Sequence, residues 1–258
     1  MKPIVFAALL ITGTLGLAPL ARAETAAEIV AAADKVRNPS RPFRSTDTLT
    51  EYVSGQPKNQ NVVVVLAKED PVTHQFRNLI RFAQPARDAG KMVLLDNRAF
   101  WFYDPASQAS VRISPQQRLT GQASVADVLN INLALDFTAA TIGQETIQDA
   151  DHKERVCDHL DLKASNPLAS YSHIEYWVER GTHYPIKGKF YSDSGRLLKI
   201  LYFRGFHEVL GQIRPAEAVL IDAVSSTLVT TVAYGDMTFQ DIPDAWFQRD
   251  YLPRLQAK

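Results

Sequence analysis

The stretch MVLLDNRAFWFYDPASQASVRIS, from Met92 to Ser114, decides the fold class. Its apolar runs at 92–95, 100–103 and 110–113 are separated by Asp, Asn, Pro and Ser, which favour turns. Asp and Asn tolerate the left-handed backbone of a tight turn, and proline fixes φ at the second connection. The pattern predicts three consecutive strands joined by turns at 96–98 and 104–105.

The middle strand of this stretch is aromatic on both faces. Because side chains alternate along a strand, Phe100 and Phe102 share one face, while Trp101 and Tyr103 share the other. A sheet with water on one side alternates apolar with polar residues instead. We therefore expect one face to pack under a helix and the other to look into a cavity, and the pattern leaves open which face does which.

Further strand-like runs, about ten residues apart, extend through most of the chain. Ser192-Asp193-Ser194-Gly195 is typical of a hairpin in which glycine takes a positive φ. Helical patterns occur only at 24–36, at 124–135 and around Pro243. These features predict a mainly β fold, a single curled antiparallel sheet that forms an incomplete, open barrel with a few helices covering the open side. The further runs are 48–53, 61–68, 72–83, 155–164, 171–179, 185–191, 196–204, 216–223 and 228–239.

The N-terminus has the pattern of a secretory signal peptide. Lys2 precedes an apolar run over residues 4–20, and Ala21-Arg22-Ala23 forms an A-x-A cleavage site. We expect residues 1–23 to be the signal peptide, with cleavage after Ala23. The remaining residues, 24–258, are then expected to form a single exported β domain.

The charge balance argues against one class of partner, and the cysteine content excludes an internal disulfide. Removal of Lys2 and Arg22 from the 28 basic residues leaves 26 against 28 acidic residues, a formal charge of −2. This balance argues against a nucleic-acid partner, because such binding depends on many contacts from Lys and Arg to phosphate. Cys157 is the only cysteine, so no internal disulfide can form.

Cys157, His159 and Asp161 share one face of a predicted strand and are candidates for a nucleophile, a base and an orienting acid. Side chains two residues apart on a strand lie about 7 Å apart, whereas a nucleophile and its base need about 3 Å. We therefore interpret all three as structural or surface residues and expect a protein that is not an enzyme and needs no metal or cofactor. A hydrolase that uses His159 or His173 with a carboxylate is the less favoured alternative.

An apolar concave face with few helices to cover it favours a cavity for a lipid or an acyl chain. Arg112 lies inside the apolar run 111–113. Pointing inward, it would meet a polar head group or a lid carbonyl; pointing outward, it would cover apolar surface with its stem. The residues predicted to line the cavity are Phe76, Ile80, Phe82, Leu94, Phe100, Phe102, Arg112, Leu160, Leu162, Phe190, Leu201 and Phe203.

Several motifs resemble those of the periplasmic outer-membrane lipoprotein-sorting proteins, relatives of the lipoprotein carriers LolA and LolB. The resemblance covers about residues 60–255, and the segment from Gly121 to Leu129 departs from the family's pattern. The matching motifs are Phe100-Trp101-Phe102-Tyr103-Asp104-Pro105, Val111-Arg112-Ile113-Ser114, Ile142-Gly143-Gln144-Glu145-Thr146-Ile147, Ile213-Arg214-Pro215, and Asp241-Ile242-Pro243-Asp244-Ala245-Trp246-Phe247 with Tyr251-Leu252.

This resemblance implies an incomplete antiparallel barrel whose open, apolar side is closed by helices and receives acyl chains. Together with the apolar concave face, it leads us to expect a soluble periplasmic carrier that transfers a lipoprotein or lipid between the inner and outer membranes, with the helix from Glu24 and the segment 124–135 as lids. The expected partners are lipoprotein acyl chains or another lipid and an inner-membrane transporter, with only transient membrane contact. The alternative is a scaffold that binds an inner-membrane lipid exporter through an exposed strand edge.

Overall fold

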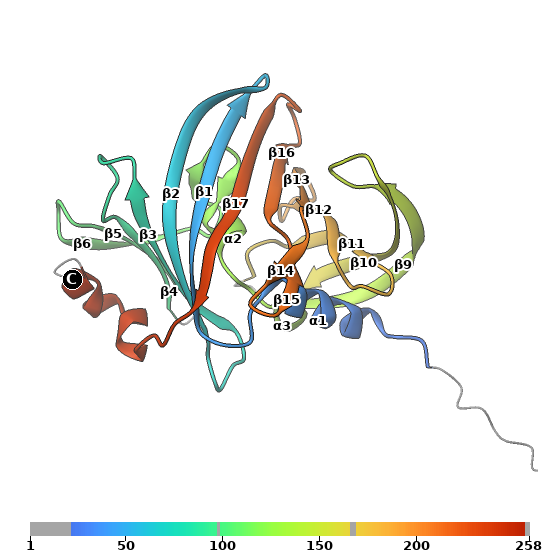
Figure 1. Ribbon diagram of the computed structural model, residues 1–258, viewed down its shortest axis with the longest axis horizontal. Coiled ribbons are helices and arrows are strands. Elements are labelled where there is room, and N and C mark those ends of the chain that lie inside the picture. The colour runs from blue at the N-terminus through green and yellow to red at the C-terminus, as the bar shows by residue number, and fades with distance from the viewer. Residues whose placement is uncertain (1–21, 97–98, 166–168, 256–258) are drawn as a thin grey trace, which may run out of the picture.

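In the computed structural model, which describes residues 22–96, 99–165 and 169–255, one curved antiparallel sheet dominates the protein (Figure 1). Most of the predicted signal peptide, residues 1–21, and the predicted turn residues Asn97 and Arg98 lie outside the described residues. The strands of the sheet are β1 (Phe43–Val53), β2 (Gln56–Glu69), β3 (Phe76–Gln84), β4 (Met92–Asp96), β5 (Ala99–Asp104), β6 (Ala109–Ile113), β9 (Phe137–Gln148), β10 (Glu154–Ala164), β11 (His173–Glu179), β12 (Pro185–Tyr191), β13 (Leu197–Arg204), β16 (Glu217–Asp222) and β17 (Leu228–Phe239).

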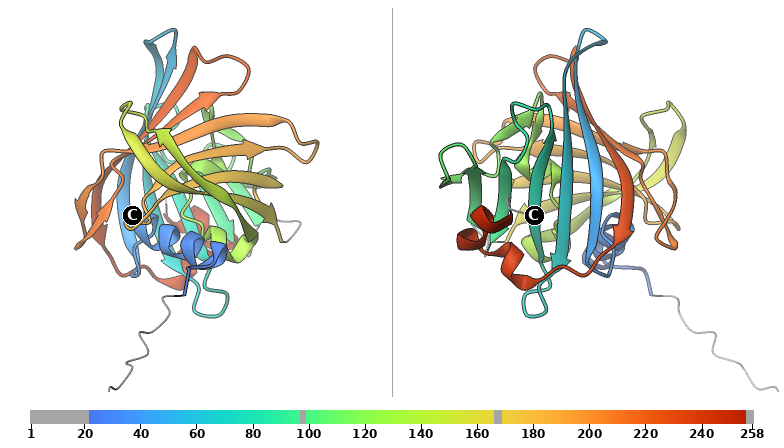
Figure 2. Two further views of the ribbon diagram at one scale, coloured as in Figure 1. Left: turned by 90° about the vertical axis from the view of Figure 1, so that its right-hand side faces the viewer. Right: turned by 60° about the vertical axis from the view of Figure 1, so that its left-hand side comes forward.

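The strand order shows how the sheet is built. It runs β6-β5-β4-β3-β2-β1-β17-β16-β13-β12-β11-β10-β9, and neighbours are mostly consecutive in the chain, as hairpins require. β1 pairs with β17 at the centre, while β6 and β9 are the two edges. The sheet curls without closing, which confirms the predicted open barrel (Figure 2).

The remaining elements are short. Two small hairpins pair β7 (Arg118–Thr120) with β8 (Ala123–Ser124), and β14 (His207–Val209) with β15 (Gln212–Arg214). None of the described helices is long and apolar enough to cross a membrane. The helical elements are α1 (Ala26–Arg37), α2 (Val125–Val128), α3 (Leu133–Asp136), η1 (Asp244–Phe247), η2 (Arg249–Tyr251) and α4 (Leu252–Leu255).

Strand β9 and the break between α2 and α3 differ from the sequence prediction. The residues of β9 were not assigned to a strand, because most of its side chains are exposed at the sheet edge and lack a clear apolar alternation; Ile142 is 55% exposed. The expected helix at 124–135 is two single turns joined by residues 129–132. The hairpin at Ser192–Gly195 forms as predicted, with Gly195 at a φ of 75°.

The concave face of the sheet is covered by α1, α2 and α3. Helix α1 begins with a capping box, in which Thr25 Oγ1 accepts from the Glu28 N–H and Glu28 Oε2 accepts from the Thr25 N–H. Its buried side chains, among them Ile29, Val30 and Ala33, join one large cluster with Phe100 and other residues of the concave face. This cluster is the main core of the protein.

The convex face is covered by the C-terminal segment, residues 242–255, which we call the C-terminal cover (Figure 2). Tyr103 is buried in this second cluster and Trp101 packs against it, together with Phe247 and Leu252. Phe100 and Phe102 belong to the concave cluster. The question left open by the sequence is therefore answered: Trp101 and Tyr103 lie under helices, and Phe100 and Phe102 face the concave side.

Candidate functional site

A cavity of about 80 Å³ lies between the concave face and the helices that cover it. Its walls come from β1, β11, β12, β13 and β17 of the sheet, and from the end of α1, residues 126–137 and Arg214-Pro215 on the other side. Most of the lining is apolar. The large apolar side chains are Phe43, Leu129, Ile131, Leu133, Phe137, Phe190, Leu201, Phe203 and Met237.

Most of the residues predicted to line a cavity lie on this concave side. Phe190, Leu201 and Phe203 line the cavity itself. Phe76 packs beside it in a small cluster with the lining residue Phe43. The others belong to the main concave cluster without lining the cavity, and they are Ile80, Phe82, Phe100, Phe102, Leu160 and Leu162.

Leu94 and Arg112 lie on the opposite face, which corrects two of the predictions. Leu94 pairs with Trp101 across the β4–β5 ladder and packs under the C-terminal cover. Arg112 pairs with Trp101 across the β5–β6 ladder and is exposed. The apolar run at 92–95 gave no alternation from which the face of Leu94 could be deduced, because both of its faces are covered.

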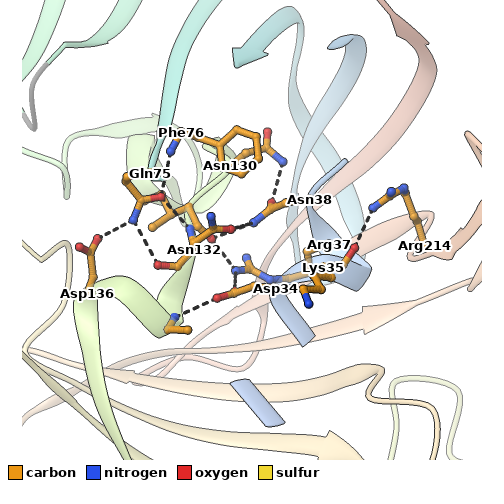
Figure 3. Close-up of polar contacts among 12 residues, drawn as sticks. Asp34, Lys35, Arg37, Asn38, Gln75, Phe76, Asn130, Asn132, Asp136 and Arg214 are labelled. Atoms are coloured by element: carbon orange, nitrogen blue, oxygen red, sulfur yellow. Dashed lines mark hydrogen bonds and ion pairs between the residues drawn. The ribbon is translucent and has the colours of Figure 1, made fainter. Parts of the chain in front are cut away.

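A polar clasp holds the covering helices together (Figure 3). It joins the last turn of α1 to residues 130–134. Arg37 Nη2 donates to Ile131 O at 2.8 Å, and Asp34 Oδ2 accepts from the Ala134 N–H at 2.9 Å. The Asn38 amide donates to Ile131 O at 3.1 Å and to Asn132 Oδ1 at 2.8 Å, and its Oδ1 accepts from Asn130 at 3.0 Å.

The clasp continues to the beginning of β3. Gln75 Oε1 accepts from the Asn132 N–H at 2.8 Å, and the Gln75 amide donates to Asp136 Oδ2 at 3.2 Å (Figure 3). Asn78 Oδ1 accepts from the Asn130 N–H at 3.0 Å and its amide donates to Asn130 O at 2.9 Å. Residues 129–132 lie between two helices, so their backbone groups need partners from elsewhere, and these amide side chains supply them.

Helix α2 is anchored separately, by Asp127. Its Oδ2 accepts from the Ser124 N–H at 2.8 Å, as in a capping box, and from Lys199 Nζ of β13 at 2.5 Å. Tyr171 donates to Asp127 Oδ1 at 2.7 Å. Burial raises the pKa of Tyr171 well above its ordinary value, with the Asp127 charge as a second cause, so this hydroxyl stays a donor. The ion pair fixes one end of the covering segment to the sheet.

Two buried carboxyl groups have raised pKa values. Burial raises the pKa of Asp34, and Arg37 and the Ala134 N–H oppose that effect. Burial raises the pKa of Asp47 to about 7, against weaker opposition from the Ser45 hydroxyl and the Gly235 backbone. Asp47 lines the cavity, so the charge of the cavity wall changes near neutral pH as Asp47 gains or loses its proton.

Arg214 is a cavity residue that sequence reasoning missed. It is 3% exposed and donates from Nη1 to the carbonyls of Lys35 and Val36, at 3.2 and 2.9 Å, at the end of α1. Figure 3 shows it reaching the helix end from outside the clasp. The only signal in the sequence was its place in the motif Ile213-Arg214-Pro215, which gives no direction for the side chain.

The residues considered for catalysis lie away from this cavity. Cys157 is fully buried, and burial raises the pKa of its thiol to about 12, so the thiolate that a nucleophile requires is not available at neutral pH. His159 stacks on Trp177 with ring centroids 4.1 Å apart. His173 Nε2 lies 2.5 Å from Asp161 Oδ1. Within the described ranges, no group of three or more His, Cys, Asp or Glu side chains is arranged to hold a metal ion.

Comparisons with known proteins place the chain among related structures. A family model described as that of an uncharacterized protein matches residues 74–254. A LolA superfamily protein from Nitrosomonas europaea is 29% identical with a TM-score of 0.78, over 89% of this chain and 100% of that one. A search of curated protein sequences gave no match.

Two further solved structures share the fold at lower identity. An outer membrane lipoprotein-sorting protein domain from Vibrio parahaemolyticus is 17% identical with a TM-score of 0.74, over 89% of this chain and 98% of that one. A DUF1329 family protein from Desulfovibrio piger is 19% identical with a TM-score of 0.73, over 88% and 97% of the two chains. At these identities the likeness concerns the fold alone.

Proposed function

The chain belongs to the family of uncharacterized proteins whose model it matches and has the fold of the LolA superfamily, and from this premise we propose that it is a periplasmic carrier of acyl chains. The carrier shelters the chains of a lipoprotein or lipid during transfer between the inner and outer membranes. The N-terminal signal pattern and the name of the lipoprotein-sorting relative support this location and cargo.

The observation that carries the proposal is the contrast between the concave face and its cover. The face is a continuous apolar surface, which includes Phe82, Phe100, Leu160 and Phe203. The helices over it are tied to one another largely by polar contacts that water can replace. A surface of this kind can be uncovered and covered again without a change in the sheet.

Carriage requires the cover to open, because the closed cavity is too small for a chain. A cavity of about 150 Å³ holds one benzene molecule, and this one has only about 80 Å³. An acyl chain must therefore displace α1 or residues 125–136 and take their place on the concave face.

The energies permit such an exchange. Five hydrogen bonds join α1 and Asn38 to residues 130–134, and at about 1 kcal/mol each they contribute about 5 kcal/mol. Burial of a chain of about 16 carbons contributes on the order of 10 kcal/mol before ordering costs. The displaced segment also exposes its own buried side chains, such as Val128 and Leu129, and the bound chain covers the same part of the concave face again. Binding of one chain can therefore offset release of the clasp, as reversible transfer needs.

A fluorescent acyl probe tests the proposal with a matched pair of tryptophan variants. Leu201→Trp fills the cavity, and Val72→Trp adds the same bulk to the exposed turn between β2 and β3, where Val72 is 84% exposed. We expect the wild type and V72W to bind the probe equally and L201W to bind at least tenfold more weakly. Failure of the wild type to bind any acyl probe, or equal binding by all three proteins, contradicts the carrier proposal.

The exposed edge strand β9 favours a second candidate function, a scaffold for an inner-membrane lipid exporter. Ile142 on this edge is 55% exposed, and an unpaired edge can accept a strand from a partner. A scaffold of this kind loses capture of the exporter in Ile142→Asp and keeps it in L201W. If the protein is a carrier, I142D binds the acyl probe as the wild type does, and L201W binds it more weakly.

A further inference from the structure

Buried polar atoms without a hydrogen-bond partner gather around the cavity. In the described part of the chain, six buried side-chain nitrogen or oxygen atoms lack a partner. Four of them belong to residues that line the cavity, namely Arg37 Nε, Arg214 Nε, Tyr176 Oη and Asp47 Oδ1. Native proteins satisfy nearly all such atoms with protein groups or ordered water, so a concentration of them in one cavity makes it a candidate site for a polar ligand.

Donors outnumber acceptors among these four atoms. The two Nε atoms and the Tyr176 hydroxyl each carry a proton to donate, and Asp47 also becomes a donor when it is protonated. Burial raises the pKa of Tyr176 well above its ordinary value, so its proton is retained. A ligand that matches this set must offer several acceptor oxygens, as a carboxylate or a phosphate does.

The charges around the cavity single out Arg214. Arg37 is paired with Asp34 at 2.7 Å, and Lys199 with Asp127 at 2.5 Å. Among the described residues no carboxylate pairs with Arg214, which is only 3% exposed. Burial alone lowers its pKa, and no carboxylate acts against that effect.

Two other features bear on the charge of the cavity. The end of α1, which Arg214 contacts, supplies about half a negative charge from the helix dipole, so part of the guanidinium charge remains uncompensated. The carboxyl group of Asp136 also lines the cavity, where its Oδ2 accepts from Gln75 on the clasp side. Asp47 is the carboxyl group whose protonation removes a negative charge from the interior near neutral pH.

We propose that the cavity is the site for the anionic head group of the cargo, with the Arg214 guanidinium as its charged partner and Tyr176 and Arg37 as further donors. This inference rests on the proposed carrier function and narrows its cargo to amphiphiles that carry a carboxylate or a phosphate. A volume of about 80 Å³ suits a group of a few heavy atoms. The chain of the amphiphile extends from the cavity along Leu201 and Phe203 and displaces residues 125–136, while α1, which carries Arg37 and contacts Arg214, keeps its place.

Three ligands with the same 16-carbon chain test this site by competition with the acyl probe, each below its micelle-forming concentration. They are palmitate, the phosphate ester 1-palmitoyl lysophosphatidic acid, and the neutral 1-monopalmitoyl glycerol. We expect at least one of the two anionic ligands to bind the wild type tenfold or more tightly than the neutral one. Tighter binding of palmitate identifies a fatty-acid cargo, and tighter binding of the phosphate ester identifies a phospholipid-like cargo.

Arg214→Gln removes the charge and keeps an N–H group for the helix carbonyls, and Arg112→Gln is the matched control on the convex face. We expect R214Q to lose the preference for anionic ligands, R214K to keep part of it, and R112Q to keep all of it. If R214Q weakens all three ligands equally, Arg214 only supports α1 and the proposal is wrong. Equal or tighter binding of the neutral ligand by the wild type overturns it too, whereas binding of none of the three contradicts the carrier function itself.

Tyr176→Phe keeps the test decisive even if R214Q fails to fold. It removes only a hydroxyl that has no partner in the described structure, so the ligand-free protein should be at least as stable as the wild type. We expect threefold to tenfold weaker binding of the preferred anionic ligand and unchanged binding of 1-monopalmitoyl glycerol. Unchanged binding of both ligands contradicts the proposed site.

Discussion

The concave and convex faces of the sheet are both covered by helices, but different interactions hold the two covers. The C-terminal cover buries Ile242, Phe247 and Leu252 against the convex face, with Tyr103 among their neighbours. The concave cover combines the apolar side chains of α1 with the polar clasp beside the cavity. The same sheet therefore carries one cover fixed by packing and another held in part by replaceable bonds.

This difference indicates which of the two covers can move. Separation of packed apolar side chains exposes their whole area to water, at about 25 cal/mol per Å². A broken hydrogen bond is largely replaced by bonds to water, so its net loss is about 1 kcal/mol. Opening of the concave cover also exposes apolar side chains such as Val30 and Val128, but a bound acyl chain can replace them on the concave face. The concave cover should therefore open for a ligand while the sheet stays intact, and the convex cover should unfold only with the protein.

The largest expected effect comes from breaking the convex cover. Phe247 is 1% exposed, and Phe247→Ala should lower the free energy of unfolding by about 3 to 5 kcal/mol because it leaves a cavity in a packed cluster. Urea unfolding measures this loss. Binding of the acyl probe by the folded fraction should change less than twofold. A large change in binding with little loss of stability would show that the C-terminal cover, too, takes part in opening.

The next effect concerns a titratable group, Asp47, on the concave side. Its folded pKa of about 7 lies above the ordinary value of 3.8, so the folded state binds the proton more tightly and stability falls as pH rises between these values. The loss attributable to Asp47 is on the order of a few kcal/mol. Urea unfolding at pH 4.5, 6 and 7.5 should show that Asp47→Asn removes this part of the pH dependence. An identical pH profile in both proteins would exclude this role for Asp47.

The smallest effect on stability, with the clearest effect on kinetics, is expected for the clasp. Asn38→Ala removes three of its hydrogen bonds and should lower the free energy of unfolding by about 1 to 3 kcal/mol. Acyl-probe association measured by stopped flow should become faster, because the cover opens more often. Asn59→Ala is the control, since Asn59 is exposed on a hairpin, where its amide donates to Glu51. Equal association rates for N38A and N59A would show that the clasp does not limit opening.

The sequence was most informative where apolar runs alternate with turn residues or repeat at the helical period. The hairpins around β5 and the helix α1 follow from local apolar periods and turn residues, and their pairing agrees with the prediction. Strand β9 was missed because an exposed edge leaves no apolar alternation. Leu94 was assigned to the wrong face because β4 is buried on both sides.

The site was less predictable than the fold, because its residues meet only through the tertiary structure. Asn38, Gln75 and Asn132 are separated by long stretches of chain and are ordinary surface residue types. Arg214 and Asp47 become unusual only because the fold buries them together around one cavity. Their burial and their missing partners are properties of the packed protein, which no local pattern encodes.

The pairing of β1 with β17 at the centre of the sheet has a consequence for folding. The ladder joins Val53 to Leu228 and Phe43 to Phe239, so its contacts span most of the chain. Contacts between residues this distant form slowly, because a long loop must close before they can form. The strands from β1 to β6 and those from β9 to β17 can assemble as separate hairpin arrays. The ladder between β1 and β17, which joins them, forms only after β17 has been synthesised. A nascent chain therefore remains without its complete sheet until β17 is available.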